Sequence, residues 1–466
     1  MRRYWSTVAV VGTVILMAMS FAVPSGPAWA AEKKDEKAVL DEVLDILKEK
    51  SQITEEKYQE LKSRAKKEGA GKILAGIEGV RPFFKSADGQ HKLELTGRLN
   101  FDLRAYEDDT RNLDGSDQRT NFLVRRARIG FDATFFKYLN VVVEGDFGAG
   151  SAILQWGYID LKYFPEARLR AGQFKVPFSF EELTSSRFTD FVERSVVNNL
   201  VPTFDLGVML HGSLLDGAVE YGAGVFNGAG QNAAETNDSK DIAGRLLVRP
   251  LKLMNLPDLG ELHLAGHITH GDQDSGQSLR GRTDGKFEFF PRTTTRGDRL
   301  RYGFEAVYNY GPFGLYGEYV GSEEERKGLG TGGKDLDDLI GQGWYVAGSV
   351  FLTGEEKVHA KAPKVKANFD PRKGHFGAVE LAARFAQLDF DASNALLPAS
   401  HPGLNRVDAF TAGINWYLSP NVRLMFNWTQ NWFDNLAATP NTKSPDVSKR
   451  SDDTSWEIMS RLALWF

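Results

Sequence analysis

The chain has 466 residues, no cysteine, 47 glycines, 12% aromatic residues and a formal net charge of −5. Because it has no cysteine, a disulfide framework is excluded. High glycine and aromatic content fits either a transmembrane β-barrel, whose strands hide their apolar faces by alternation, or a large soluble β protein. Composition alone does not separate these two classes.

The first 30 residues have the three parts of a secretory signal peptide. Arg2 and Arg3 form a charged beginning, residues 8–19 form an apolar run, and "AWA" at 28–30 is a small-x-small cleavage site. The apolar run is shorter than the roughly 20 residues that a transmembrane helix needs. We therefore predict that residues 1–30 are an export signal and take no part in the fold.

Residues 31–70 are charged, and their apolar side chains follow a helical spacing. This apolar stripe consists of Val39, Leu40, Val43, Leu44 and Leu47. A second helix is expected after Thr54, whose hydroxyl suits an N-cap, with Glu55 and Glu56 in the first turn. The segment is predicted to be a short periplasmic helical hairpin or coiled coil that could associate the copies of an oligomer; the alternative is a flexible spacer.

From residue 90 onward, polar and apolar residues alternate with a period of two. In "LELTGRLNFDLRAY" (93–106), Leu99 and Phe101 share one face, and Arg98, Asn100 and Asp102 share the other. In a soluble sandwich the apolar face packs a core, whereas in a porin it meets lipid and the polar face meets water. Strands of about 9–11 residues, as found here, suit a membrane crossing.

Sixteen strands are predicted, and an even number is what a bacterial single-chain barrel requires. They lie near 92–106, 119–135, 138–148, 152–164, 167–178, 204–214, 217–227, 240–249, 260–271, 299–311, 313–323, 342–353, 375–390, 405–418, 421–433 and 453–466. Short connections fall on the periplasmic side and long polar ones, including 272–298, fall outside. A short outer connection at 148–151 and a long basic inner one at 354–374 break this rule. The predicted fold class is all-β: a 16-stranded antiparallel transmembrane β-barrel over residues 90–466.

Two further features favour the barrel over a soluble protein. Aromatic residues stand near strand ends, where interfacial girdles belong. They are Tyr138, Tyr163, Phe164, Tyr308, Tyr310, Trp416, Tyr417, Trp428, Trp432 and Trp465. The last strand, "SWEIMSRLALWF", closes on Phe466, which resembles the signal that bacterial outer-membrane barrels present to the barrel-assembly machinery. The expected location is the outer membrane of a Gram-negative bacterium, in contact with its lipid.

Three arginines stand in the predicted strand "FLVRRARIGF" (122–131). Arg126 and Arg128 share parity with Asp132 and are expected to face the lumen. Arg125 has the opposite parity, so it lies either beside a bulge or at a subunit contact or interface. These arginines could instead pair with lumen acids such as Glu144 and Asp146 and serve only to keep the pore folded.

Several stretches, in order along the chain, resemble the phosphate-selective porin O and P family. They are "FLVRRARIGF", "LRAGQFKVPFSFEELTSSRFTDFVERS" (169–195), "FLTGEE" (351–356), "GAVELAARF" (377–385) and "INWYLSPNVRL" (414–424). The resemblance implies a trimeric, sixteen-stranded barrel that passes anions. It also favours Arg125 and Arg126 acting together, which requires a local irregularity in the strand.

The resemblance points to a loop at 179–203 that folds inward as the constriction. In it, Ser185, Ser186 and Arg187 offer hydroxyl and guanidinium donors that suit an oxyanion. Phosphate-specific family members have a lysine just before this position, where Glu182 stands here and is expected to repel phosphate. The family also implies a ladder of lumen arginines, namely Arg98, Arg104, Arg168, Arg170, Arg245, Arg384 and Arg423.

The predicted function is passive diffusion of small inorganic or organic anions, phosphate-like or polyphosphate-like, through an arginine-lined constriction. The alternative is a general porin without phosphate selectivity. No Ser-His-acid set is apparent, so an enzyme is not expected. On a strand, His263 and His267 share a face while His270 points away, and no cysteine supports a metal site. No cofactor and no nucleic-acid partner are predicted.

Overall fold

The structure is a computed structural model that describes residues 44–50, 53–69, 72–107, 118–235, 237–358, 360–391, 405–434 and 454–466. Contacts divide the chain into two units. One comprises the chain up to Leu74 together with Lys85–Gln90, and the other comprises Ala75–Phe84 and His91–Phe466. The expected export signal and the apolar positions Val39, Leu40 and Val43 lie outside the described residues.

The first unit contains a short helical segment at 44–49 and the helix α3 (Glu55–Gly69). Thr54 Oγ1 accepts a hydrogen bond from the Lys57 amide at 3.3 Å, as expected of an N-cap. The two helical pieces are joined by Tyr58, whose hydroxyl donates to Asp45 at 2.5 Å. Among the described residues, no helix is long and apolar enough to cross a membrane.

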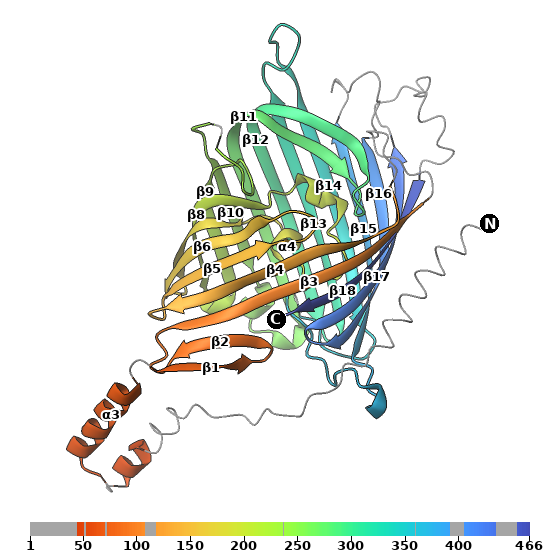
Figure 1. Cartoon of the computed structure of the whole chain (residues 1–466). Helices are drawn as coiled ribbons and strands as arrows, with labels where there is room; N and C mark the ends of the chain where they lie inside the picture. Colours follow the sequence, from red (N-terminus) through yellow and green to blue (C-terminus); the bar gives the residue numbers. More distant parts are fainter. Residues whose placement is uncertain are drawn as a thin grey trace. The chain divides into compact units, whose positions relative to one another are not determined.

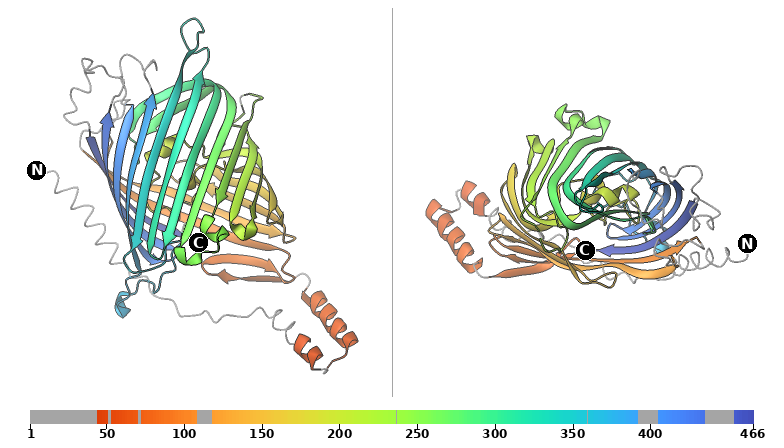
Figure 2. Two further views of the ribbon diagram at one scale, coloured as in Figure 1. Left: turned by 180° about the vertical axis from the view of Figure 1, so that it is seen from behind. Right: turned by 90° about the horizontal axis from the view of Figure 1, so that it is seen from above.

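Sixteen antiparallel strands form a closed barrel, in which each strand pairs with the next and β18 pairs back with β3 (Figures 1 and 2). They are β3 (Lys92–Tyr106), β4 (Asn121–Phe135), β5 (Leu139–Asp146), β6 (Ile153–Phe164), β7 (Ala167–Lys175), β8 (Phe204–Leu214), β9 (Val219–Phe226), β10 (Asp241–Val248), β11 (Glu261–Arg282), β12 (Glu288–Tyr310), β13 (Phe313–Arg326), β14 (Leu336–Phe351), β15 (Ala378–Asp391), β16 (Arg406–Ser419), β17 (Val422–Asp434) and β18 (Thr454–Trp465). Each predicted strand overlaps one of these, although β11 and β12 extend well beyond the predicted 260–271 and 299–311, so the predicted fold class is confirmed. The pairing of β1 (Ile73–Glu78) with β2 (Arg81–Ser86) was not predicted.

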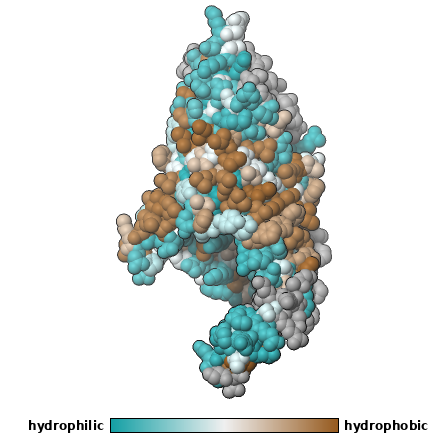
Figure 3. Space-filling view, turned by 90° about the vertical axis from the view of Figure 1, so that its left-hand side faces the viewer, coloured by the Kyte–Doolittle hydropathy of each residue, from teal (hydrophilic) through white to brown (hydrophobic). Residues whose placement is uncertain are grey.

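The two faces of the barrel wall differ as the alternation predicts. Large apolar side chains are exposed on the outside of the barrel, and Figure 3 shows an apolar area on one side of the molecule. They include Leu99, Ile129, Val143, Ile159, Leu210, Ile242, Leu264, Ile268, Phe304, Leu315, Val346, Leu381, Ile414, Leu462 and Leu464. The opposite parity carries buried polar and charged side chains that face the lumen. An apolar exterior around a polar interior is the arrangement of a barrel in lipid.

The predicted aromatic girdle is present in part. Tyr138 and Tyr163 stack at 3.8 Å between ring centroids near a short connection. Two of the predicted members are wrong, because Tyr417 and Trp465 are buried in the lumen, at 3% and 4% exposure. Tyr417 donates a hydrogen bond to Glu380 at 3.4 Å and accepts one from an arginine, a polar role that the spacing of aromatics does not reveal.

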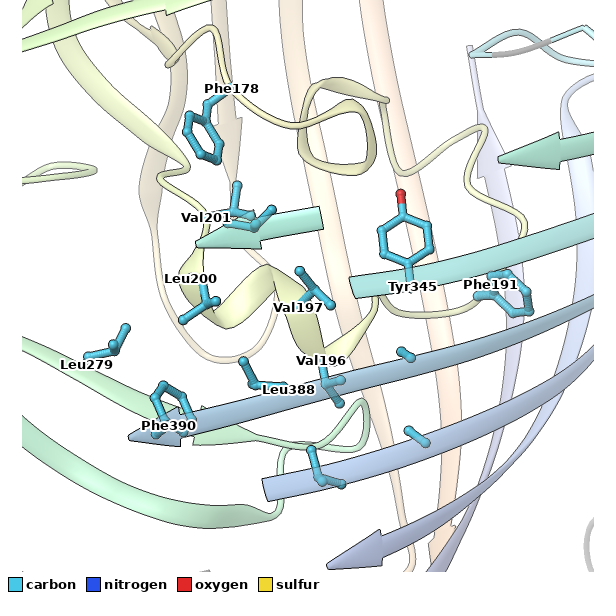
Figure 4. Packing of buried hydrophobic residues seen from close by; sticks show 14 of the residues in the cluster. Phe178, Phe191, Val196, Val197, Leu200, Val201, Leu279, Tyr345, Leu388 and Phe390 are labelled. Carbon is cyan, nitrogen blue, oxygen red and sulfur yellow. The ribbon is translucent and has the colours of Figure 1, made fainter. Parts of the chain in front are cut away.

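Residues 176–203, called the inner loop below, fold into the barrel and carry α4 (Phe180–Leu183) and η1 (Val196–Leu200) (Figure 1). Its apolar residues form a cluster with lumen-facing residues of the wall (Figure 4). The loop members Phe178, Phe191, Val196, Val197 and Leu200 meet Leu279, Tyr345, Leu388 and Phe390. This apolar packing holds the inner loop against the wall inside the barrel.

A second segment also turns inward, against the prediction of a polar outer loop at 272–298. β11 continues to Arg282 and β12 begins at Glu288, and their turn, residues 279–293, is called the tip below. The rings of Phe287, Phe289 and Phe290 are buried at 1% exposure or less. They pack on the lumen side, where the Phe290 ring stacks on Phe390 at 4.2 Å. The prediction was wrong because these rings must leave water, which an outer loop does not allow.

Candidate functional site

A β-bulge at Arg125 interrupts the pairing of β3 with β4. Asn100 lies opposite Arg126, whereas the next residue, Phe101, lies opposite Val124, so Arg125 is the extra residue. The bulge reverses the alternation, and Val124 and Phe122 beyond it are 42% and 55% exposed on the outer face. The predicted irregularity is therefore confirmed. The alternative of an outward Arg125 is wrong, because its Nε donates to Glu193 of the inner loop at 2.9 Å.

The connection after β5 supports this bulge. Asp146 Oδ1 accepts hydrogen bonds from the amides of Ala127 at 3.1 Å and Gly148 at 3.0 Å. The backbone of Gly148 lies so close to the bulge that a Cβ on it would stand 2.7 Å from Arg126 Cα. Glycine is therefore required at position 148, and the short outer connection that broke the length rule has a structural reason.

The arginines of the predicted site differ in their partners. Arg128 is paired, with its Nε 2.7 Å from Asp146 and its Nη1 3.4 Å from Glu144. Arg125 is paired with Glu193. The interpretation of these residues as structural ion pairs is thus supported for two of them.

Arg98 and Arg126 have no carboxylate partner among the described residues. Arg98 donates to the hydroxyls of Ser186 at 2.5 Å and Ser185 at 3.3 Å. Arg126 is 5% exposed, and its Nε and Nη1 have no hydrogen-bond partner in the part of the chain that the structure describes. The side-chain amide of Asn100, opposite Arg126, also lacks one. Buried donors without partners are costly, so these groups are suited to an incoming ligand or water.

A cavity of about 760 Å³ brings most of the predicted site together. Ten basic and three acidic side chains line it. The basic ones are Arg98, Arg125, Arg126, Arg128, Lys175, Arg194, Arg280, Arg282, Lys286 and Arg292, and the acidic ones are Asp146, Glu182 and Glu193. Ser185 and Ser186 line it too, whereas Arg187 does not and lies 3.6 Å from Glu144.

Six of these basic residues were missed by the sequence analysis: Lys175 and Arg194, and four on the tip, namely Arg280, Arg282, Lys286 and Arg292. The signal that could have found the four on the tip is the apolar run "FEFF" (287–290), which is out of place in a polar outer loop. Phe287 and its neighbours anchor the tip, while the basic residues around them reach the cavity.

Glu182 does not stand alone in the cavity. Its carboxylate lies 3.3 Å from Lys175 Nζ and 3.2 Å from Arg194 Nη1. Both cations also line the cavity. The repulsion of phosphate expected from Glu182 is therefore offset locally by two positive charges.

Glu193 is the junction between the inner loop and the wall. Its Oε1 lies 2.6 Å from Arg104, 2.9 Å from Arg125 and 3.2 Å from Arg461. Burial favours the neutral form, but these arginines outweigh it and hold the pKa of Glu193 well below its usual range. The Glu193 carboxylate therefore reduces the positive charge that Arg125 presents to the cavity.

The arginines of the predicted ladder differ from those of the cavity in their partners. Apart from Arg98, its members do not line the cavity, and they bind wall or loop acceptors instead. Arg168 and Arg170 share Asp160, Arg245 binds Glu305, Arg104 binds Asp102 and Glu193, Arg384 binds Glu181 and Asp284, and Arg423 binds Thr189 O and the Tyr417 hydroxyl. The basic inner connection 354–374 also takes part, because Lys357 is buried and bridges Asp190 of the inner loop to Glu380.

A closed sixteen-stranded barrel, apolar outside and charged inside, with a loop folded into its lumen, is the architecture of outer-membrane porins. The family model "Phosphate-selective porin O and P" matches residues 93–448, and the chain belongs to this family. The protein is an outer-membrane porin of Gram-negative bacteria, and its family and fold point to a channel.

The chain is similar to solved porins at low identity. The chain is similar to an anion-selective porin from Comamonas acidovorans, with 15% identity, 81% of this chain and 100% of that chain covered, and a TM-score of 0.50. It is also similar to the channel DcaP of Acinetobacter baumannii (10%, 84% and 100%, TM-score 0.49) and to OmpT of Vibrio cholerae (11%, 81% and 98%, TM-score 0.49). No curated protein matches the sequence.

Proposed function

We propose that this porin passes small anions of the phosphate type through the cavity between the bulge, the inner loop and the tip. Arg98, Arg125, Arg126 and Arg128 are the cations of its wall, and Ser185 and Ser186 its hydroxyl donors. The observation that carries the proposal is Arg126, a buried cation without a partner among the described residues, in a cavity with ten basic and three acidic side chains. The family description, phosphate-selective, agrees with this.

The pairing pattern also explains how an anion would leave. A guanidinium matches two oxygens of an oxyanion, so several unpaired arginines would hold phosphate tightly. Conduction requires binding that is weak enough for release. In this cavity Arg125 and Arg128 already have Glu193 and Asp146 as partners. These carboxylates compete with the anion for the guanidinium groups of Arg125 and Arg128 and so limit how tightly the anion is bound. Arg98 and Arg126 attract the anion.

Planar-bilayer recording of the purified porin tests the proposal. In a KCl gradient the reversal potential is expected to show anion preference, and phosphate is expected to block the chloride current. Arg126→Ala should weaken that block about tenfold or more, the equivalent of about 1.4 kcal/mol for a lost charge-assisted hydrogen bond. Arg170→Ala is the matched control, because Arg170 lies outside the cavity and Asp160 keeps Arg168. Cation preference in the wild type would contradict the proposal.

The alternative is a general porin, and the three acidic side chains in the cavity favour it. It differs in one measurement: chloride current without phosphate block, unchanged by Arg126→Ala. We also propose, from the family, that the barrel works as a trimer, which chemical cross-linking in intact membranes tests.

A further inference from the structure

His267 lies on β11 and has no role in the anion cavity. Its side chain has 0% exposure, and among the described residues neither Nδ1 nor Nε2 has a hydrogen-bond partner. A polar ring buried in this way is costly, so it calls for an explanation such as an ion that it binds. His263, four residues earlier, differs because it pairs with Glu261 at 2.7 Å.

Two buried carboxylates face the ring. Nε2 of His267 lies 3.4 Å from Glu318 Oε1 on β13 and 3.7 Å from Glu305 Oε2 on β12. The side chains of both glutamates are at most 2% exposed. Both separations are longer than the 2.7–3.2 Å of an ordinary hydrogen bond. The three candidate ligand atoms lie within 4.8 Å of one another.

These separations fit a shared metal ion. Zinc binds histidine nitrogen and carboxylate oxygen at about 2.0–2.2 Å, so two ligands at a tetrahedral angle stand about 3.4 Å apart. Imidazole and carboxylate form a donor set that zinc accepts. The charge also fits, because two carboxylates face the site and, in the described part of the chain, Arg245 is the cation in contact with them.

We propose that His267, Glu305 and Glu318 bind a divalent transition-metal ion, with zinc as the best match, in a site distinct from the anion cavity. Three protein ligands leave the remaining tetrahedral position to water. Arg245 on Glu305 acts as the outer partner that orients a ligand carboxylate.

The site would connect the wall to the start of the inner loop. Glu318 accepts the amide of Phe180 at 3.0 Å and the hydroxyl of Tyr345 at 3.0 Å. The Phe178 ring packs against His267 at 4.0 Å between centroids. A metal held by Glu318 and His267 would therefore fix α4 in place, and with it the loop that narrows the lumen.

Zinc titration of the purified, chelator-treated porin in detergent tests the site by calorimetry. The wild type is expected to bind one zinc ion per chain, and His267→Ala and Glu318→Gln are expected to weaken binding at least tenfold. His263→Ala is the matched control and should bind as the wild type does. Absence of zinc binding to the wild type, or equal binding by His267→Ala, would overturn the proposal.

X-ray absorption of the zinc-loaded wild type keeps the test independent of how the variants fold. Scattering from one imidazole ring in the zinc spectrum is expected. A shell of oxygen without imidazole overturns the site. Neither result depends on anion selectivity, so the anion proposal stands or fails separately.

Discussion

Two pairs of lumen arginines show how similar sequence positions acquire opposite roles. Arg98 and Arg126, on β3 and β4, line the cavity and meet no carboxylate among the described residues. Arg384 and Arg461, on β15 and β18, are at most 2% exposed and fully engaged. Arg384 binds Glu181 and Asp284, and Arg461 binds Asp102 with two hydrogen bonds of 2.6 and 2.8 Å.

The two pairs differ in the acidic side chains that surround them and not in the parity or burial of the arginines themselves. All four side chains have lumen parity and nearly equal burial. The acids that reach Arg384 come from the inner loop and the tip. In the cavity that Arg126 lines, the inner loop presents the hydroxyls of Ser185 and Ser186, its carboxylates are paired with other cations, and the tip presents cations. The acids that the inner loop, the tip and the wall place beside each arginine therefore decide which arginines hold the barrel together and which remain open to a solute.

The largest expected loss of stability comes from removing an arginine that is paired with buried carboxylates. Arg384→Ala leaves the carboxylates of Glu181 and Asp284 buried without their cation. Such a loss costs about 3–5 kcal/mol. Arg126→Ala breaks no pair, so its free energy of unfolding should stay within about 1 kcal/mol of the wild type.

Urea unfolding in detergent, followed by tryptophan fluorescence, measures both variants. Equal destabilisation by the two substitutions would contradict the distinction between arginines that are paired with carboxylates and arginines that are not.

The next largest effect concerns the bulge. Gly148→Ala puts a methyl group 2.7 Å from Arg126 Cα, where neither backbone can give way easily. Forced repacking costs about 1–3 kcal/mol, so the bulge should be displaced and Arg125 turned from Glu193. Phosphate block of the chloride current should weaken about tenfold. Gly244→Ala on β10 is the control, because its Cβ would meet only Ile268, at 3.9 Å. Unchanged block in Gly148→Ala would separate anion binding from the bulge.

The sequence was sufficient for the barrel and for the bulge. A period of two repeated over sixteen segments identifies strands directly, because each strand must satisfy lipid on one face and water on the other. Strict alternation cannot turn both Arg125 and Arg126 into the lumen, which left a bulge or an outward Arg125 as alternatives, and the family resemblance favoured the bulge.

The partners of the arginines were not predictable in the same way. Arg384 and Asp284 are 100 residues apart, and Arg461 and Glu193 are 268 apart. Their contact depends on how the inner loop and the tip fold into the barrel. Alternation identifies strands but does not say how a polar connection between two strands folds. The tip was therefore predicted to lie outside, and Arg280 and Arg282 were missed.

A smaller effect is expected from replacing Glu182. This substitution tests how much a paired carboxylate reduces the attraction of the cavity for anions. Glu182→Gln removes a negative charge from between Lys175 and Arg194 and leaves both cations facing the cavity. Phosphate should block chloride current at a few-fold lower concentration, since an unneutralised cation attracts the anion more strongly. Glu235→Gln, in an exposed loop, serves as the control. Weaker block in Glu182→Gln would mean that Glu182 positions Lys175 and Arg194 for the anion.

The smallest effect separates exposed cations from buried ones. Arg292 lines the cavity from the tip and is exposed, whereas Arg126 is 5% exposed. Charges in water are screened over about 10 Å at 0.1 M salt and about 3 Å at 1 M. Arg292→Gln should therefore reduce the anion-to-cation permeability ratio less than about threefold at 0.1 M KCl and not at all at 1 M.

The loss in Arg126→Ala should persist at 1 M, because a buried charge is screened much less. Lys327→Gln is the control for Arg292, since Lys327 is exposed on another outer turn and paired with Glu325. If the two arginine variants lose selectivity equally at 1 M, burial does not distinguish the tip from the bulge. The cavity would then act through its total charge, and the free guanidinium of Arg126 would have no special part in it.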